Sequence, residues 1–288
     1  MYEEKSYDQY VEEQTKINNE IFQNLGKTNY RWYARDGVYS PKVYFEKGRL
    51  RIVFVFFEVC PKKDEKDLWE PVSKVENEFK IDKGNPAARY ILPSLRAIYG
   101  LGKDSPVPGV GYINLRKYRR DGEETHNTDS GKLFEAVHDS SLEQNWVFRQ
   151  LKCLKPDVLI CMGTFSFFWN DMGFLYEEPS SGIFEHHFQE TGKEIVKRVS
   201  TKELESKEAP LRAKEDKMFS CWIPCEGINE KETGPKLIIQ TYHSAHHYHE
   251  FKLENYLPEA INHLEKNEFE NWSLINSLQA QGQSSTTP

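Results

Sequence analysis

Apolar residues recur at helical spacing near the start of the chain. Between residues 7 and 25 their spacing is close to that of one helix face, and Gly26 follows the last of them. This period gives a helix one apolar face, and glycine often follows the end of a helix. We therefore expect an N-terminal helix within residues 1–26.

Further along, short apolar runs predict β-strands. The run Ile52–Phe57 is apolar on both faces, as in a central strand that is covered on both sides. Helical patterns at 86–99 and 141–154 separate the runs, and alternation of strands with helices favours a parallel sheet. We therefore expect an α/β fold: three α/β/α layers around a central, mostly parallel four-stranded sheet. The four expected strands are residues 51–57, 111–115, 158–161 and 237–240, with a further short strand at 42–45.

The pattern weakens elsewhere in the chain. Residues 171–236 are rich in charge and fit no simple strand or helix pattern, so we interpret them as an insertion or lid. Residues 257–266 predict a closing helix, and the polar residues 278–288 predict a disordered tail. The rest, residues 1–277, is expected to form a single domain.

Composition narrows the class of protein. Apolar residues make up 38% of the chain, enough for a core, and the net charge of −7 argues weakly against a non-specific nucleic-acid coat. A local basic groove stays compatible with that charge. No apolar run approaches the roughly 20 residues of a membrane span, and the acidic N-terminus does not resemble a secretory signal. The five cysteines favour reduced thiols. We therefore expect a cytoplasmic protein with no membrane partner.

Chemically useful side chains follow the predicted strands. Ligands of open α/β sheets bind outside the carboxyl ends of the strands, which here are Glu58, Asn114, Gly163 and His243. A carboxylate can activate water, an amide can read the edge of a base, and a histidine can stabilise a developing anion. Each also has an ordinary structural interpretation. Together they predict a site for hydrolysis of an N-glycosidic bond through an oxocarbenium-like state.

Five segments, in order along the chain, support this interpretation. RIVFVFFEVCP resembles a strand leading into a G-E-A-P-G loop, GYINLRKYR resembles Y-I-T-N-V-V-K-C-R, and LIIQTYHSA resembles V-x-x-T-Y-H-P-S-A. On these segments the chain resembles the uracil-DNA glycosylase superfamily, closest to the branch that usually carries an iron–sulfur cluster. The matching segments are residues 51–61, 85–100, 111–119, 154–166 and 237–245.

The resemblance implies a role for each matched residue. Glu58 would activate water, Asn114 would read the base, and His243 would stabilise the departing base anion. An aromatic ring would stack on the flipped base, with Phe79 or Trp69 as the choices. The base-binding residues would then be Asn114, Phe57 and Phe79, and the DNA-binding residues Gly163, Thr164, Ser244, His246, Tyr248, Arg116 and Lys117.

The chain departs from the pattern of that branch at several positions. Tyr118 stands where a cluster cysteine is expected and no N-terminal cysteine pair exists, so we expect no iron–sulfur cluster and no other cofactor. Phe57 replaces a glycine and Ser244 a proline. A rebuilt pocket makes a modified cytosine a better substrate hypothesis than plain uracil. Some similar proteins excise hypermodified phage cytosines in antiviral defence, which we take as the working hypothesis.

Other interpretations stay open. The resemblance implies that the segment after His243 forms a wedge into duplex DNA. Its histidines, with Cys221 and Cys225, could instead bind zinc, but we expect no metal. The expected protein is a monofunctional, monomeric glycosylase that binds DNA and flips the base out of the stack. One alternative is a catalytically inactive binder or sensor that keeps the pocket. Another is an interaction protein that docks a partner through residues 171–236.

Overall fold

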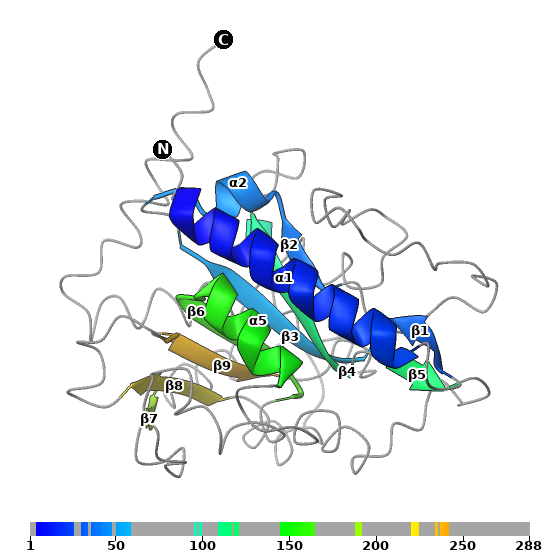
Figure 1. Cartoon of the computed structure of the whole chain (residues 1–288). Helices are drawn as coiled ribbons and strands as arrows, with labels where there is room; N and C mark the ends of the chain where they lie inside the picture. The colour runs from blue at the N-terminus through cyan, green and yellow to red at the C-terminus, as the bar shows by residue number, and fades with distance from the viewer. Residues whose placement is uncertain are drawn as a thin grey trace, which may run out of the picture.

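The computed structural model places part of the chain in a mixed α/β arrangement (Figure 1). The residues it describes are 4–25, 30–33, 36–47, 50–58, 95–96, 98–99, 109–116, 118–120, 145–164, 188–191, 220–224, 234–235 and 237–241.

A seven-stranded sheet is the centre of this arrangement, in the order β2-β4-β3-β6-β9-β8-β7. Strands β4, β3, β6 and β9 are parallel to one another, and the remaining three pair antiparallel at the two sides. A separate two-stranded sheet pairs β1 with β5. The strands are β1 (Tyr30–Tyr33), β2 (Gly37–Tyr39), β3 (Ile52–Glu58), β4 (Val110–Arg116), β5 (Tyr118–Arg120), β6 (Val158–Met162), β7 (Phe188–Thr191), β8 (Ser220–Pro224) and β9 (Leu237–Thr241).

The four parallel strands confirm the strands expected from the apolar runs, but the expected number of four for the whole sheet is wrong. Three antiparallel strands extend it, and two of them, β7 and β8, lie within residues 171–236. That segment therefore contributes two strands to the sheet. Short edge strands have weak sequence signals because their pairing depends on the neighbouring strand more than on their own pattern.

The strand expected at residues 42–45 is also wrong. These residues fall in helix α2 (Pro41–Tyr44) and the turn after it. Pro41 occupies the start of the helix, where a missing N–H costs nothing. The carbonyl of Ser40 accepts hydrogen bonds from the N–H groups of Val43 and Tyr44, both at 3.0 Å.

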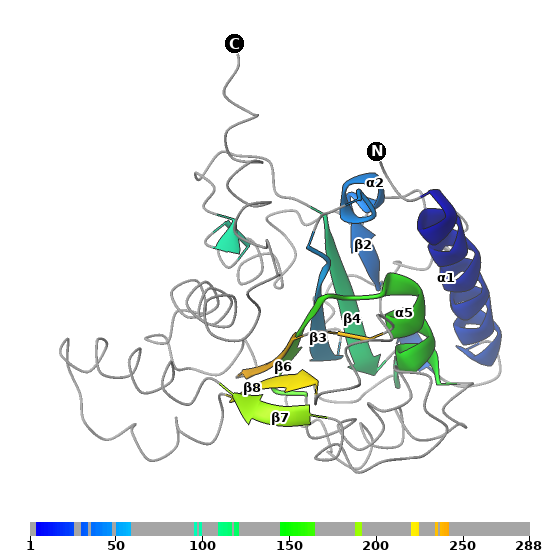
Figure 2. The same cartoon turned by 90° about the vertical axis from the view of Figure 1, so that its left-hand side faces the viewer.

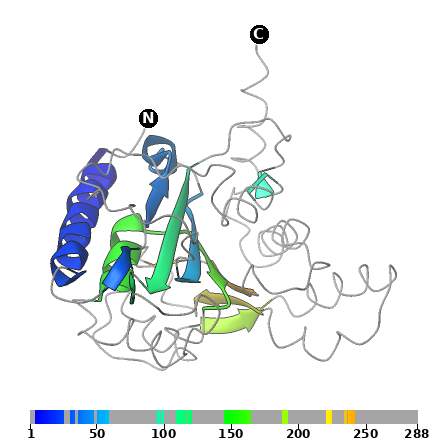
Figure 3. The same cartoon turned by 90° about the vertical axis from the view of Figure 1, so that its right-hand side faces the viewer.

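Two longer helices cover one face of the sheet. Helix α1 (Glu4–Leu25) confirms the expected N-terminal helix, and α5 (Trp146–Leu154) forms the second half of the pattern at 141–154. Figures 2 and 3 show α1 and α5 on the same side of the sheet. Of the pattern at 86–99, a single turn is described, in which the Tyr99 N–H donates to Leu95 at 2.9 Å. The helix at 257–266 and the tail at 278–288 lie outside the described residues.

The core lies between the sheet and these helices. Alternate residues of the parallel strands point to α1 and α5, among them Val53, Ile113, Leu159 and Ile238. The other face of β3 is equally buried, since Ile52 and Phe54 are at most 1% exposed. Burial on both faces is the property that the continuous apolar run predicts.

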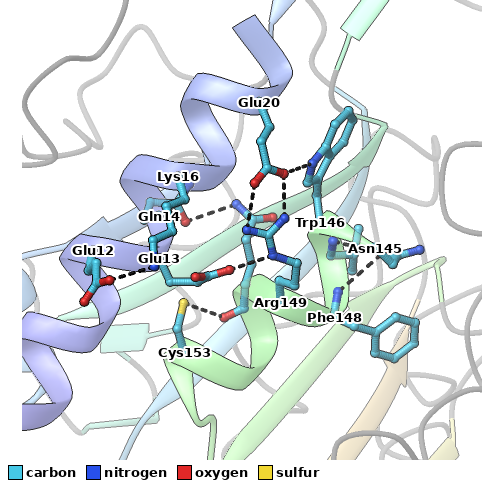
Figure 4. Close-up of polar contacts among 12 residues, drawn as sticks. Glu12, Glu13, Gln14, Lys16, Glu20, Asn145, Trp146, Phe148, Arg149 and Cys153 are labelled. Carbon is cyan, nitrogen blue, oxygen red and sulfur yellow. Dashed lines mark hydrogen bonds and ion pairs between the residues drawn. The ribbon is translucent and has the colours of Figure 1, made fainter. Parts of the chain in front are cut away.

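Polar side chains join α1 to α5 above this core. Figure 4 shows Arg149 of α5 between Glu13 and Glu20 of α1. Its guanidinium donates to Glu13 at 2.6 Å and to both carboxylate oxygens of Glu20, and the Trp146 indole N–H also donates to Glu20, at 3.0 Å. Gln150 donates to Gln14 at 3.2 Å. These bonds fix how α1 lies against α5.

Candidate functional site

The order of the parallel strands indicates where a ligand would bind to this sheet. Along the chain, β3 comes first, β4 pairs on one side of it, and the chain then crosses to place β6 and β9 on the other side. The direction of the connections therefore reverses between β3 and β6. In sheets of this kind, ligands bind outside the carboxyl ends of the strands at that reversal. The candidate site is thus the carboxyl edge of β3 and β6, with β4 and β9 on either side.

The strands separate at this edge. Pairing between β3 and β6 extends as far as Val55 with Cys161, whereas β3 continues beside β4 until Glu58 is opposite Arg116. Strand β6 ends at Met162, and Gly163 turns the chain with a φ of 72°, a left-handed conformation that favours glycine. Glycine at position 163 therefore makes this turn without the strain that a residue with a Cβ atom would meet.

Two hydrogen bonds hold the turn after β6. The Gly163 N–H donates to the carbonyl of Thr241 in β9 at 2.6 Å. The Thr164 hydroxyl donates to the carbonyl of Val55 in β3 at 3.1 Å. Thr164 is fully buried. The turn to which the resemblance gives a DNA-binding role thus also links the ends of β3, β6 and β9.

Asn114 lies on β4 with its side chain completely buried. Its amide nitrogen donates to Oδ1 of Asp36 at 2.8 Å, and its backbone N–H donates to the same oxygen at 2.9 Å. Its amide oxygen accepts a hydrogen bond from the Tyr112 hydroxyl at 3.2 Å. Each end of the amide therefore has a partner within the protein, and each end of an amide can make two hydrogen bonds. Because the side chain is completely buried, a base reaches it only if the residues that cover it move.

Aromatic rings accompany Asn114 on the face of the sheet opposite α1 and α5. The rings of Phe54 and Phe56 are stacked with their centroids 6.3 Å apart. The ring centroids of Phe56 and Tyr112 are 4.9 Å apart. Phe56 is the register partner of Asn114. An amide beside planar rings is a suitable environment for a planar heterocycle.

The two cysteines whose side chains are described, Cys153 and Cys161, are free and buried. Cys161 is fully buried, and burial raises the pKa of its thiol well above the ordinary value. Burial likewise raises the pKa of Cys153 to about 12. A neutral, buried thiol is a poor nucleophile, so both cysteines are core residues.

The predicted site residues fall into three groups. Gly163 and Thr164 follow β6 at the reversal, and Asn114 lies two residues before the end of β4 rather than at it. The backbones of Glu58 and Arg116 pair at the ends of β3 and β4, and the backbone of Phe57 lies beside them. The side chains of those three, and all of Trp69, Phe79, Lys117, His243, Ser244, His246 and Tyr248, lie outside the described residues.

A metal site receives no support from the part of the chain that the structure describes. Within it, no group of three histidine, cysteine or acidic side chains is arranged to hold a metal ion. Cys225 and the histidines after residue 242 lie outside that part, so the zinc alternative concerns residues beyond it.

Sequence reasoning missed Asp36 and Tyr112, the two partners of the Asn114 amide. Tyr112 is two positions before Asn114, so the period of a strand places both on one face. Asp36 precedes Gly37 at the start of β2 and is 78 residues from Asn114. Strand periodicity could have predicted that Tyr112 lies beside Asn114. No local sequence pattern connects Asp36 with Asn114.

Comparison with known proteins identifies no relative, because no family model, curated protein or solved structure matches the chain. Among the described residues, no helix combines the length and apolar character needed to cross a membrane.

Proposed function

We propose that this protein is a DNA glycosylase, a monofunctional hydrolase that cleaves the N-glycosidic bond of a flipped-out pyrimidine and leaves an abasic site. The proposed family is the uracil-DNA glycosylase superfamily, with its three-layer α/β/α fold but without an iron–sulfur cluster. The proposed base is uracil or, as the altered first motif favours, a modified cytosine such as a hypermodified phage base. That substrate would give the protein a role in antiviral defence.

The observation that supports this proposal is the convergence of the matched motifs on one edge of the sheet. Glu58 ends β3, Asn114 is near the end of β4, Gly163 and Thr164 follow β6, and β9 ends two residues before His243. These strands are adjacent and parallel, and the reversal of their order lies among them. Segments more than 180 residues apart in the sequence therefore meet at one edge, the kind of place where ligands bind in parallel sheets.

The proposed chemistry assigns one task to each residue. The carboxylate of Glu58 positions a water molecule and accepts its proton as the water oxygen bonds to C1′ of the sugar. The electrons of the C1′–N bond leave with the base, and His243 stabilises the anion. Asn114 holds the base through its amide, beside Phe56 and Tyr112. Binding the departing anion more tightly than the intact nucleotide lowers the barrier.

One observation favours a second candidate, an inactive DNA binder or sensor. The Asn114 amide is buried and hydrogen bonded to Asp36 and Tyr112, so in this conformation it does not present itself to a base. Phe57, in place of a glycine before Glu58, favours the same alternative. The two candidates differ in turnover, since a sensor would bind modified DNA without releasing a base.

Base release measured by mass spectrometry tests the proposal. The protein is incubated with uracil-containing DNA, ordinary genomic DNA and phage DNA carrying modified cytosines. We expect a free pyrimidine from one of these samples, and a fall of at least about a hundredfold in its release rate for Glu58→Gln or His243→Ala, as for loss of a general acid–base group.

Glu12→Gln is the matched control for Glu58→Gln. Glu12 lies on the exposed surface of α1, where its carboxylate pairs with Lys16 at 2.6 Å. Its substitution should leave base release unchanged. If the wild-type protein binds DNA but frees no base from any sample, the sensor replaces the enzyme as the better account.

A further inference from the structure

Asp36 holds the Asn114 amide in one orientation. An ionised carboxylate is an acceptor only, so it requires the amide nitrogen, not the amide oxygen, to face it. Oδ1 of Asp36 accepts from that nitrogen at 2.8 Å and from the Asn114 backbone N–H at 2.9 Å. A reversed amide would place two acceptor oxygens against each other. The carboxylate therefore fixes which end of the amide is the donor and which the acceptor.

Tyr112 contacts the other end of the same amide, but its bond is easier to exchange. The hydroxyl donates to Oδ1 of Asn114 at 3.2 Å and is neutral. Hydrogen bonds to a charged group are about twice as strong as neutral ones. A hydroxyl can also rotate to accept a hydrogen bond instead. When a polar ligand competes for the Asn114 amide, we therefore expect it to exchange with Tyr112 more readily than with Asp36.

The direction of the amide has a chemical consequence for a pyrimidine. Uracil presents a donor at N3 and an acceptor at O4, whereas cytosine presents an acceptor at N3 and a donor at the exocyclic nitrogen. An amide that pairs with both positions must have its oxygen toward N3 for uracil and its nitrogen toward N3 for cytosine. A fixed amide therefore accepts one type of base and opposes the other.

We propose that Asp36 is the residue that determines base specificity, because it fixes the orientation of the Asn114 amide and so selects between uracil-type and cytosine-type bases. The inference rests on the proposed glycosylase function. Asp36 is a positioning residue: it acts through Asn114 and has no contact with the reacting atoms of the sugar.

Two variants that each remove one partner of the amide test the proposal. Asp36→Asn replaces the carboxylate with an amide of the same shape, which can face Asn114 with either its oxygen or its nitrogen. Tyr112→Phe removes the hydroxyl and keeps the ring that packs on Phe56. The measurement is the ratio of release rates from matched oligonucleotides, one with a single uracil and one with a single 5-hydroxymethylcytosine. Thermal unfolding of each variant monitors the fold.

We expect Asp36→Asn to reduce the preference for one base over the other by about tenfold or more, since it replaces a hydrogen bond to a charged acceptor. Tyr112→Phe should keep the wild-type preference. Asp36→Glu, which restores a carboxylate, should recover part of the preference, and it provides a second folded variant if Asp36→Asn unfolds.

The outcomes separate this inference from the function on which it rests. If the wild-type protein releases a base and Asp36→Asn lowers both rates equally, Asp36 has a structural role only and the inference is wrong. A loss of preference in Tyr112→Phe as large as that in Asp36→Asn would also overturn it. If the wild-type protein releases no base from these oligonucleotides or from the uracil-containing, genomic and phage DNA samples, the proposed function itself has failed, and the specificity role fails with it.

Discussion

Thr241 is an unusual residue at the carboxyl edge of the sheet. Its side chain is 1% exposed, and its hydroxyl oxygen has no hydrogen-bond partner in the described part of the structure. A buried hydroxyl without a partner costs about 1–3 kcal/mol of stability. Valine has the same shape without the hydroxyl, so Thr241→Val should raise the free energy of unfolding by about 1 kcal/mol. Urea denaturation of both proteins measures the difference.

Thr164→Val is the matched control, because its hydroxyl does have a partner. It donates to the carbonyl of Val55 at 3.1 Å, and its loss leaves that buried carbonyl with one bond fewer. This variant should lower the free energy of unfolding by about 1 kcal/mol. If Thr241→Val proved as destabilising as Thr164→Val, the hydroxyl of Thr241 would have to be satisfied in solution.

At the scale of elements, the contact between α1 and α5 should make stability depend on pH. Burial alone would raise the pKa of the Glu20 carboxyl, but hydrogen bonds from Arg149 and Trp146 outweigh burial and lower its pKa below the ordinary 4.5. A carboxyl with a lowered pKa in the folded state stabilises the protein above its ordinary pKa and loses that contribution as pH falls through the lower value. Glu20→Gln should therefore lower the Tm at pH 7, with a difference that shrinks below pH 4.5.

The control for this prediction uses a carboxylate on the same helix. Glu12 also has a lowered pKa, through its hydrogen bond and charge interaction with Lys16, but both side chains are exposed and belong to α1. Exposed pairs within one helix contribute little to stability. Between pH 3 and pH 7, the Tm of Glu12→Gln should equal that of the wild-type protein. If its Tm fell as much as that of Glu20→Gln, the pH dependence could not be assigned to the contact between α1 and α5.

The elements that could be predicted from the sequence are those whose own pattern determines their burial. Ile52–Phe56 and Val158–Cys161 are apolar throughout because both faces of the strand are buried, and α1 has one apolar stripe because one side packs on the core. Strands β7 and β8 have no such pattern, and their place depends on β9, which offers an edge for pairing. Pro41 was a usable helix-start signal for α2, but the apolar residues after it suggested a strand.

The candidate site could be predicted in part for the same reason. Strand ends follow from strand assignments, so Glu58, Gly163 and Thr164 could be placed at one edge. The environment of Asn114 could not, because it depends on a hydrogen bond between residues 78 positions apart. Partners of a buried polar group are selected by tertiary packing, and a single sequence has no local pattern for them.

At the scale of the whole molecule, the two ends of the parallel strands differ in how closely β3 and β6 are joined. At the amino edge, Asp157 before β6 accepts hydrogen bonds from the backbone N–H of Arg51, at 2.9 Å, and from its guanidinium, at 3.4 Å. The Arg51 carbonyl in turn accepts from the N–H groups of Asp157 and Val158. These bonds join the starts of β3 and β6. The two strands separate at their other ends, where the candidate site lies. The amino edge should therefore support stability, and the carboxyl edge chemistry.

Substitutions at the two edges should separate these tasks. Asp157→Asn keeps the shape of the side chain but removes its charge, and should lower the free energy of unfolding by about 1–3 kcal/mol with base release per folded molecule unchanged. Glu58→Gln should do the reverse, with an unfolding curve close to that of the wild-type protein and base release abolished. Urea denaturation and base release, measured on the same preparations, give both quantities. The opposite result, in which Asp157→Asn abolishes base release and Glu58→Gln only destabilises the fold, would contradict the proposed site. It would place the functional site at the amino ends of the strands instead.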